Sequence, residues 1–239
     1  MEKIIVITGG SDGLGRVLAT DLAKDNGVII LSNNEEQLKE AMDEIGCDSY
    51  FCDVRDYGQV EEVMSDIVER YGKIDVLINN AGLLIQGELD MNDAEKIKAV
   101  IDVNLLGVIN CAKAVIPSMK QQSDGIILNI NSQSGVIIKP NRSIYNASKW
   151  GLTGFTRSLQ NEVAKHGIRV TDIMPGTIKT NLWKNNGYNR ETPEDALDSS
   201  EVSRFIQFII DTPKDVAIYE IGIRNTNDYY TMCFQQDSE

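Results

Sequence analysis

Short runs rich in β-branched residues alternate along this chain with longer amphipathic runs, and this alternation restricts the folds open to it. Helical patterns separate strand-like runs, which predicts βαβ units and a parallel sheet. We therefore expect one α/β domain with a doubly wound sheet and helices on both faces. The strand candidates are 3–8, 28–31, 49–52, 74–78, 126–131, 168–173 and 217–223, and the helical candidates are 14–25, 35–45, 59–71, 94–121, 143–165 and 201–211.

Size and charge narrow the function. A chain of 239 residues fits a single domain, 1–239. Its net charge of −13 disfavours nucleic acid and anionic membranes, because both are bound by Lys and Arg side chains. We find neither a signal-peptide pattern nor an apolar run of the roughly 20 residues that cross a bilayer. We expect a cytoplasmic protein that acts on a small molecule. Four scattered cysteines indicate neither disulfides nor a metal site: Cys47, Cys52, Cys111 and Cys233.

Glycines follow the first strand candidate directly, in the run TGGSDGLG. Gly9, Gly13 and Gly15 have the spacing G-x-x-x-G-x-G at a predicted strand-to-helix turn. Such glycines let the backbone approach a pyrophosphate, whose charge is met by the N–H groups of the helix start. The sequence thus predicts a Rossmann-like dinucleotide site, and the alternative is a glycine-rich turn that binds no ligand.

The same run also contains G-x-S-x-G, which is typical of the nucleophile elbow of α/β-hydrolases. Ser11 would be the nucleophile, and His166, the single histidine, its base. His166 stands before Gly167 at a predicted helix end, where a basic residue commonly interacts with the helix dipole. A serine hydrolase is therefore a remote alternative.

The end of the second strand bears on the form of the dinucleotide. An acidic residue there would bind a ribose diol and an Arg would bind a 2′-phosphate. This chain has Ser32 and Asn33 instead, which can bond either form. Asp12, inside the glycine run, would repel an extra phosphate. We expect NAD or NADP, with a slight lean to NAD.

Polar or small residues also follow three later strand candidates. Asp53 is placed to reach an adenine amino group, or it begins the next helix as a cap. The run Asn80-Ala81-Gly82 suits a ligand crevice at the carboxyl edge of a parallel sheet, or a plain turn. Ser132 ends the fifth strand candidate, where its hydroxyl can reach a substrate oxygen.

Tyr145 and Lys149 are four positions apart in SIYNASKWG and share one face of the predicted helix. A nearby ammonium favours the phenolate and lowers the pKa of the phenol. The pair is thus a candidate acid/base couple for a hydroxyl or carbonyl oxygen. The alternative is an exposed Tyr beside a solvated Lys.

The predicted helix 94–121 is apolar nearly all round in its centre, which indicates that a second subunit covers it, as in a homodimer or homotetramer. Asn104 lies inside this apolar run. It is either a satisfied core amide or part of a site.

In order and spacing, seven motifs resemble the short-chain dehydrogenase/reductase family over residues 3–223: TGGSDGLG, CDV, NNAG, DVNLLG, NINS, YNASK and MPG. The resemblance implies that Tyr145 exchanges a proton with the substrate oxygen and that Lys149 lowers its pKa and binds the nicotinamide ribose. It implies that Ser132 polarises the substrate oxygen and that Asn104 supports Lys149 through a water. Cofactor contacts are implied for the residues of these motifs, including Leu14, Val54, Pro175 and Gly176, and for Ile178 and Thr180.

The C-terminal third carries the parts that vary in such a family. Residues 181–200 resemble a substrate lid, and Gln133, Arg142 and Trp183 are candidates to line the pocket, with Arg142 placed to pair with a carboxylate. The run IYEIGIR resembles the branch that acts on small hydroxy acids. The tail 224–239 is atypical, and its run 229–234 predicts an extra strand or a segment docked on a neighbouring subunit.

These observations predict an NAD(P)-dependent oxidoreductase that interconverts a secondary alcohol and a ketone or aldehyde of small or medium size, with no metal. The alternative from another class is a dinucleotide-binding redox sensor without turnover.

Overall fold

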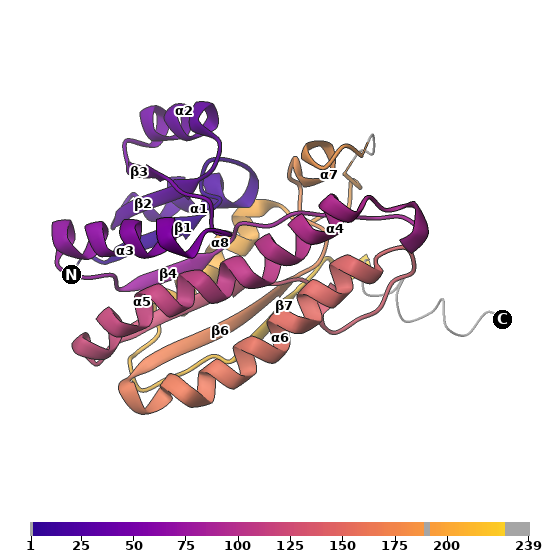
Figure 1. Cartoon of the computed structure of the whole chain (residues 1–239). Coiled ribbons are helices and arrows are strands. Elements are labelled where there is room, and N and C mark those ends of the chain that lie inside the picture. Colours follow the sequence, from indigo (N-terminus) through magenta and orange to yellow (C-terminus); the bar gives the residue numbers. More distant parts are fainter. Residues whose placement is uncertain (1, 189–191, 228–239) are drawn as a thin grey trace.

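The computed structural model describes residues 2–188 and 192–227 and shows one α/β domain (Figure 1). Seven parallel strands form its sheet in the order β3-β2-β1-β4-β5-β6-β7. The strands are β1 Ile4–Thr8, β2 Gly27–Ser32, β3 Asp48–Phe51, β4 Val76–Asn79, β5 Gly125–Ile130, β6 Ile168–Pro175 and β7 Glu220–Ile223. The predicted doubly wound sheet is confirmed. Strand order reverses between β1 and β4, and ligands bind beside the carboxyl ends at such a reversal.

Helices cover both faces of this sheet. They are α1 Gly13–Leu22, α2 Glu35–Ile45, α3 Tyr57–Tyr71, α4 Ala94–Ile101, α5 Val108–Gln122, α6 Ser143–Val163, α7 Leu182–Asn185 and α8 Ser199–Asp211. In β1, Ile5 and Ile7 pack in the core with α1, α2 and α8, whereas Val6 packs in the core with α3, α5 and α6. Side chains that alternate along a buried strand thus join the two helical layers to the sheet.

The helix predicted over 94–121 is interrupted. A π-helical segment, η2 Asp102–Gly107, separates α4 from α5 and contains Asn104. Gly107 ends it where a Cβ atom would lie 2.6 Å from Val54 Cγ2, so only glycine lets α5 approach this loop. Single π turns of this kind occur frequently at functional sites.

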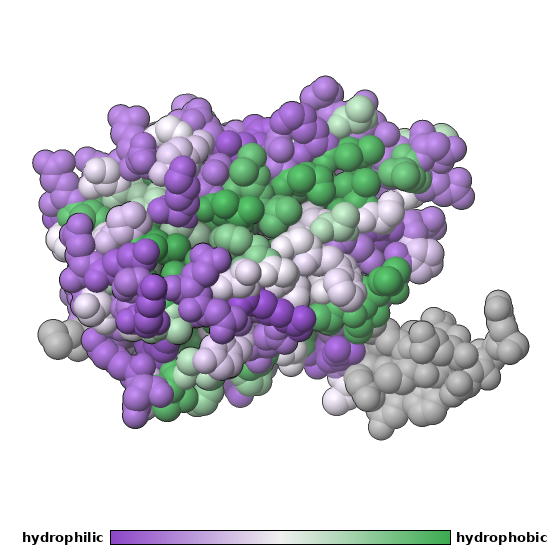
Figure 2. Space-filling model, turned by 60° about the horizontal axis from the view of Figure 1, so that its bottom comes forward, coloured by the Kyte–Doolittle hydropathy of each residue, from purple (hydrophilic) through white to green (hydrophobic). Residues whose placement is uncertain are grey.

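Apolar side chains are exposed on the surface formed by η2 and α6. Leu106 in η2 is 42% exposed and Trp150 in α6 is 48% exposed. Figure 2 shows hydrophobic residues gathered in a band across this face. The expected second subunit would cover such a band, and the homo-oligomer stays a prediction.

By length and composition alone, one helical run in the described chain, 94–122, could cross a bilayer. Cys111, Val115 and Met119 of this run are fully buried against the sheet. A core helix that packs on a sheet meets the same two criteria.

The C-terminal segment is described only as far as residue 227. The predicted extra strand at 229–234 and Cys233 lie outside the described residues. The other three cysteines are free thiols.

Candidate active site

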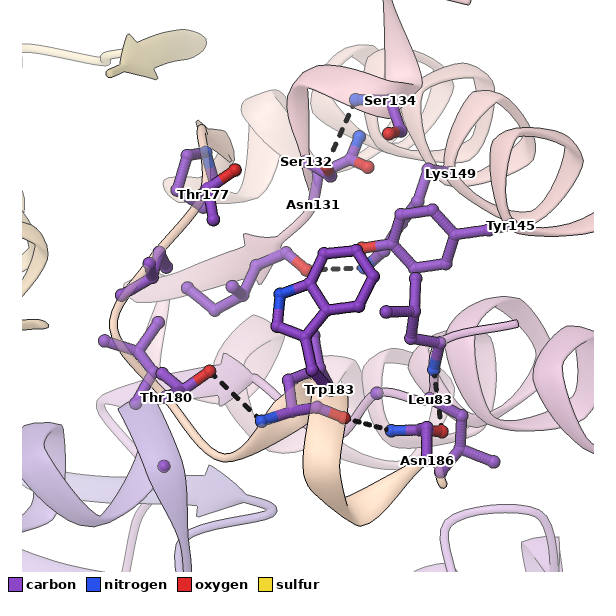
Figure 3. Close-up of a pocket in the computed structure, with 18 of the residues that line it drawn as sticks. Leu83, Asn131, Ser132, Ser134, Tyr145, Lys149, Thr177, Thr180, Trp183 and Asn186 are labelled. Carbon is purple, nitrogen blue, oxygen red and sulfur yellow. Dashed lines mark hydrogen bonds between the residues drawn. The ribbon is translucent and has the colours of Figure 1, made fainter. Parts of the chain in front are cut away.

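A pocket of about 310 Å³ opens at the carboxyl edge of the sheet, between the loops that follow β1, β4, β5 and β6 and the helices α6 and α7 (Figure 3). It lies at the strand-order reversal. Most of the predicted site residues line it: Gly9, Asp12, Gly13, Leu14, Asn80, Ala81, Gly82, Ser132, Gln133, Arg142, Tyr145, Lys149, Pro175, Gly176, Ile178, Thr180 and Trp183. The predicted residues outside its wall are Ser11, Gly15, Ser32, Asn33, Asp53, Val54 and Asn104.

The glycine turn is held against the end of β4. Asn80 Nδ2 donates to the backbone oxygens of Thr8 and Gly9, at 3.0 and 3.1 Å. Gly9 has a φ of +64°, and a Cβ atom on Gly15 would lie 2.1 Å from the Gly9 oxygen. The turn therefore requires glycine at both positions, and bare backbone forms this end of the pocket. Asp12 begins α1, with its Oδ1 accepting from Gly13 N at 2.7 Å.

Ser11 does not face the pocket. Its hydroxyl donates to Ser32 Oγ at 2.8 Å, and both side chains are buried. His166 lies immediately before β6, whereas Ser11 follows β1. Because the strands are parallel, the two residues lie at opposite edges of the sheet. The serine hydrolase alternative is therefore wrong.

Asp53 is engaged within its own loop. Its carboxylate accepts from Arg55 N at 3.0 Å and from Arg55 Nε at 2.9 Å. The Arg55 guanidinium lowers the pKa of Asp53, with a smaller contribution from Asn33. The predicted contact to adenine would have to compete with this pair. Gln37 of α2, which the sequence did not single out, lines the pocket instead.

Tyr145 lies at the centre of the pocket wall and is only 8% exposed. Its ring packs with Trp183 and Leu84 in a small apolar cluster. Burial raises the pKa of Tyr145, and hydrogen bonding with Ser132 and the charge of Arg142 oppose that rise. In this structure the phenol is therefore held protonated.

Lys149 lies on the same side of α6 as Tyr145, with Nζ 5.9 Å from the centre of the phenol ring (Figure 3). Its Nζ donates to the Ile130 oxygen at 2.9 Å. Burial lowers the pKa of Lys149 to about 8, against the attraction of Asp172. The sequence predicts that Lys149 lowers the pKa of Tyr145. In the structure burial raises that pKa, and the cationic side chain that opposes the rise is Arg142.

Asn104 behaves as a satisfied core amide. It is fully buried, its Oδ1 accepts from Leu83 N at 2.7 Å, and its Nδ2 donates to Leu83 O at 2.9 Å and Ser148 Oγ at 3.1 Å. These bonds fasten η2 to the loop after β4. Any water relay to Lys149 would have to share an amide that is already bonded.

Ser132 and Gln133 differ in how their polar atoms are used. Ser132 Oγ accepts from Ser134 N at 3.1 Å and begins the short helix η3 Gln133–Gly135. Gln133 is 5% exposed and lines the pocket, and its Nε2 has no hydrogen-bond partner among the described residues. A buried amide donor left in this state is available to a ligand.

The expected lid is seated over the pocket through α7 and the residue after it. Asn185 Nδ2 donates to Asp12 Oδ2 at 2.5 Å, and Asn186 Oδ1 accepts from Leu84 N at 3.0 Å. The Tyr188 hydroxyl bonds to both backbone groups of Gln86. The polar run after Trp183 is the signal that could have identified these three residues; 189–191 lie outside the described chain.

Two cationic side chains border the substrate end of the pocket, Lys139 and Arg142. The Arg142 guanidinium lies 5.2 Å from the centre of the Trp183 ring. The acidic side chain in the pocket wall, Asp12, lies at the opposite end, on the glycine turn.

Comparison with known proteins agrees with this geometry. Residues 3–191 match the family model of the short chain dehydrogenases, and the chain belongs to this family. It is an oxidoreductase by descent: it is 32% identical over 230 residues to an uncharacterized oxidoreductase of Staphylococcus saprophyticus, with 93% of this chain and 97% of the relative covered. It is 36% identical over 219 residues to carbonyl reductase family member 4 of Xenopus laevis, with 89% and 93% covered.

The fold agrees with solved structures as well. An alcohol dehydrogenase from the archaeon Thermococcus sibiricus, complexed with 5-hydroxy-NADP, superimposes with a TM-score of 0.83 at 29% identity, covering 95% of this chain and 97% of that one.

Proposed function

We propose that this protein interconverts a secondary alcohol and a ketone or aldehyde, with NAD or NADP as the redox partner and Tyr145 as the acid/base. The observation that carries this proposal is the convergence of Tyr145, Lys149 and Ser132 on one pocket whose far end is a glycine turn. Bound NAD(P) would supply or accept the hydride at the substrate carbon.

The chain's own residues would handle the proton and the oxygen. In the reductive direction the Tyr145 hydroxyl gives its proton to the substrate oxygen as hydride reaches the carbon, which leaves a phenolate beside the Lys149 ammonium. The Ser132 hydroxyl donates to the same oxygen and keeps it in reach. Trp183, over the pocket, excludes water from the reacting atoms.

The glycine turn fits a dinucleotide. A Cβ atom on Gly9 or Gly15 would collide with neighbouring backbone, so glycine at both positions keeps the turn compact at the start of α1, where a pyrophosphate would bind. Residues of the loop after β6, such as Ile178 and Thr180, would border the nicotinamide. The slight lean to NAD has no support from the NADP-type ligand of the Thermococcus relative, so the proposal takes either form.

Replacement of Tyr145 tests the proposal. Tyr145→Phe should lower turnover by about 10²- to 10⁴-fold, because the positioned proton donor is lost. Cofactor affinity, measured as quenching of protein fluorescence on addition of NADH or NADPH, should change little. Tyr219→Phe, which alters a 57% exposed phenol, is the matched control.

A redox sensor gives a different result. Such a protein would bind NAD(P)H but show no oxidation or reduction at 340 nm with any of a panel of ketones, hydroxy acids and sugars. Turnover that survives Tyr145→Phe would contradict the acid/base role.

We also propose that the substrate carries a carboxylate. Gln133 offers a buried amide donor that has no hydrogen-bond partner among the described residues, and Arg142 offers a guanidinium that also lines the pocket. A carboxylate can accept hydrogen bonds from both side chains, and hydrogen bonds to an ionised group are stronger than those between neutral groups.

Replacement of Arg142 tests for the carboxylate. Arg142→Leu should raise the KM for a 2- or 3-hydroxy acid by ten-fold or more and leave the KM for the matching uncharged alcohol within about two-fold. Equal effects on both substrates would contradict the carboxylate.

We also propose that the protein is cytoplasmic and that it forms a homo-oligomer. A cytoplasmic protein agrees with its charge, and a homodimer or homotetramer would cover Leu106 and Trp150. Sedimentation of the purified chain tests the assembly.

A further inference from the structure

A row of polar side chains lies buried between the sheet and α6. Asn129 Nδ2 donates to Thr156 Oγ1 at 2.9 Å, and Asn131 Nδ2 donates to Thr153 Oγ1 at 2.8 Å and to Asp172 Oδ2 at 3.0 Å. Asn129 and Asn131 belong to β5 and its end, and Asp172 belongs to β6, paired in register with Asn129. The row therefore runs directly under the helix that carries Tyr145 and Lys149.

Asp172 is the acidic member of this row, and its residue is fully buried. A buried carboxylate is costly unless charges or hydrogen bonds compensate it. Its Oδ1 has no hydrogen-bond partner among the described residues. No step of the proposed reaction uses this carboxyl group, so its cost has no explanation in the chemistry described above.

The explanation lies in its position relative to Lys149. The Lys149 ammonium donates to the oxygen of Ile130, and the next residue, Asn131, donates to Asp172. Thr153, one helical turn after Lys149, donates to the Lys149 oxygen at 3.2 Å and accepts from Asn131. Lys149 and Asp172 thus hold the same strand end from two sides.

We propose that Asp172 is a positioning residue for the reaction: its carboxylate fixes Asn131, next to Ser132, and its negative charge keeps the Lys149 ammonium protonated. The inference rests on the proposed function, because it takes Lys149 as the cation that supports the Tyr145 phenolate.

Charges around Asp172 agree with this role. The charged groups that act on Asp172 are Lys149 and Arg157 of α6 and Glu220 of β7, and the residue after β5 is the neutral Asn131. Burial raises the pKa of Asp172 to about 6, and the largest opposing influences are Asn131 and then Lys149. Since burial lowers the pKa of Lys149 to about 8, both groups are charged only between these values. Loss of the Asp172 charge would lower the pKa of Lys149 further.

Lysine ¹³Cε NMR measures the pKa of Lys149 directly and does not require turnover. The resonance that disappears in Lys149→Met is assigned to Lys149 and titrated from pH 5 to pH 11. In Asp172→Asn, which keeps an oxygen for Asn131 but removes the charge, the titration midpoint of Lys149 should fall by one pH unit or more. Glu220→Gln, on the next strand and in an exposed pair with Arg157, is the control and should shift it by less than about 0.3 unit.

The pH profile of kcat/KM is the second measurement. The wild-type profile should fall along an alkaline limb near pH 8, where Lys149 loses its proton. Asp172→Asn should shift this limb downward by one pH unit or more, which gives a deficit of about five-fold or more at pH 8 and a much smaller one at pH 6.5. A merely structural role would lower the rate equally at both pH values.

Failure of the inference and failure of the proposed function are distinguishable. A Lys149 midpoint that is unchanged in a folded Asp172→Asn variant overturns the inference, whatever the activity. A shifted midpoint in a protein that turns over no substrate supports the electrostatic role and contradicts the proposed function. If Asp172→Asn does not fold, the wild-type Lys149 resonance decides: a small step near pH 6 supports the coupling, and its absence overturns it.

Discussion

Lys149 Nζ donates its 2.9 Å hydrogen bond to the backbone oxygen of Ile130, so the end of β5 holds this lysine in place and Tyr145 does not. The ammonium stays 5.9 Å from the centre of the phenol ring. At this separation its contribution is a charge beside the phenol rather than a bond to it. The effect on Tyr145 then depends on whether Lys149 is protonated.

The first prediction concerns this charge. Lys149→Met should lower turnover by about 10²-fold or more at pH 7, since the phenolate that forms at Tyr145 loses its neighbouring cation. Lys149→Arg keeps a cation that does not titrate in this range, so the alkaline limb near pH 8 should disappear from its pH profile. The measurement is kcat/KM from pH 5.5 to pH 9.5. An alkaline limb that persists in Lys149→Arg would assign it to another group.

The second prediction concerns the glycine turn. Gly15→Ala should lower the free energy of unfolding by about 1–3 kcal/mol, because its Cβ atom would lie 2.1 Å from the Gly9 oxygen. NAD(P)H binding should be lost with it. Among the described residues, no atom outside the α6 backbone around Gly154 lies within 4 Å of its Cβ position, so Gly154→Ala is the matched control and should stabilise by about 0.5–1 kcal/mol. Urea unfolding measures both, and equal effects would refute the packing argument.

The third prediction concerns the lid. Tyr188→Phe removes both hydrogen bonds to the backbone of Gln86 and should weaken lid closure by about 1 kcal/mol. The KM for substrate should rise about fivefold with a smaller change in kcat, and cleavage by a protease near α7 should become faster. The control is again Tyr219→Phe. An unchanged KM would mean that these bonds do not hold the lid in solution.

The fourth prediction is a pH dependence of stability. Burial raises the pKa of Asp172 to about 6, so the folded protein binds this proton more tightly than the unfolded chain does. The resulting stabilisation is complete below pH ~4 and is lost as the pH rises through about 6. Asp172→Asn lacks this loss, so its free energy of unfolding relative to wild type should increase by on the order of 2–3 kcal/mol from pH 4 to pH 7.

Glu220 provides a comparison, because its contribution to the free energy of unfolding changes with pH in the opposite direction. Arg157 lowers the pKa of Glu220, so its contribution is present at neutral pH and is lost on acidification. Glu220→Gln should therefore destabilise slightly at pH 7 and not at pH 3. Urea unfolding at each pH measures both variants, and a flat difference between Asp172→Asn and wild type would contradict the raised pKa.

Local signals predicted element boundaries where side chains or glycine act as caps. The helix α2 was predicted over 35–45, as found, because Asn34 accepts from Gln37 N and Gly46 has the left-handed φ of +73°. The helix α1 was predicted to reach residue 25 but ends at Leu22, where Asn26 Nδ2 bonds to the Leu22 oxygen. That contact from outside the helix leaves no periodic signal in the sequence.

The last strand shows the same limit. A strand was predicted from residue 217, but β7 begins at Glu220. Arg169 donates to the Val216 oxygen at 3.1 Å and Thr171 donates to the Ile218 oxygen at 2.6 Å. Side chains of β6 thus take backbone acceptors that a ladder would have used, and only the tertiary structure shows this.

In the site, residues at strand ends were predictable because a parallel sheet brings its carboxyl ends together. Ser132, which follows β5, lies in the pocket for that reason, whereas Tyr145 and Lys149 were predictable from their four-residue spacing on α6. The contact between Asn185 and Asp12 spans 173 positions and depends on how the lid folds back. No sequence pattern singles out Asp172 within the strand candidate 168–173, because its place beside Asn131 depends on the register of β5 and β6.

Asp12 has one carboxylate with two duties: its Oδ1 begins α1 and its Oδ2 holds Asn185 of the lid. Asp12 therefore connects the glycine turn, where the dinucleotide would bind, to the lid over the substrate. If a bound dinucleotide that fixes Asp12 raises the affinity for substrate, bound substrate must raise the affinity for the dinucleotide by the same factor.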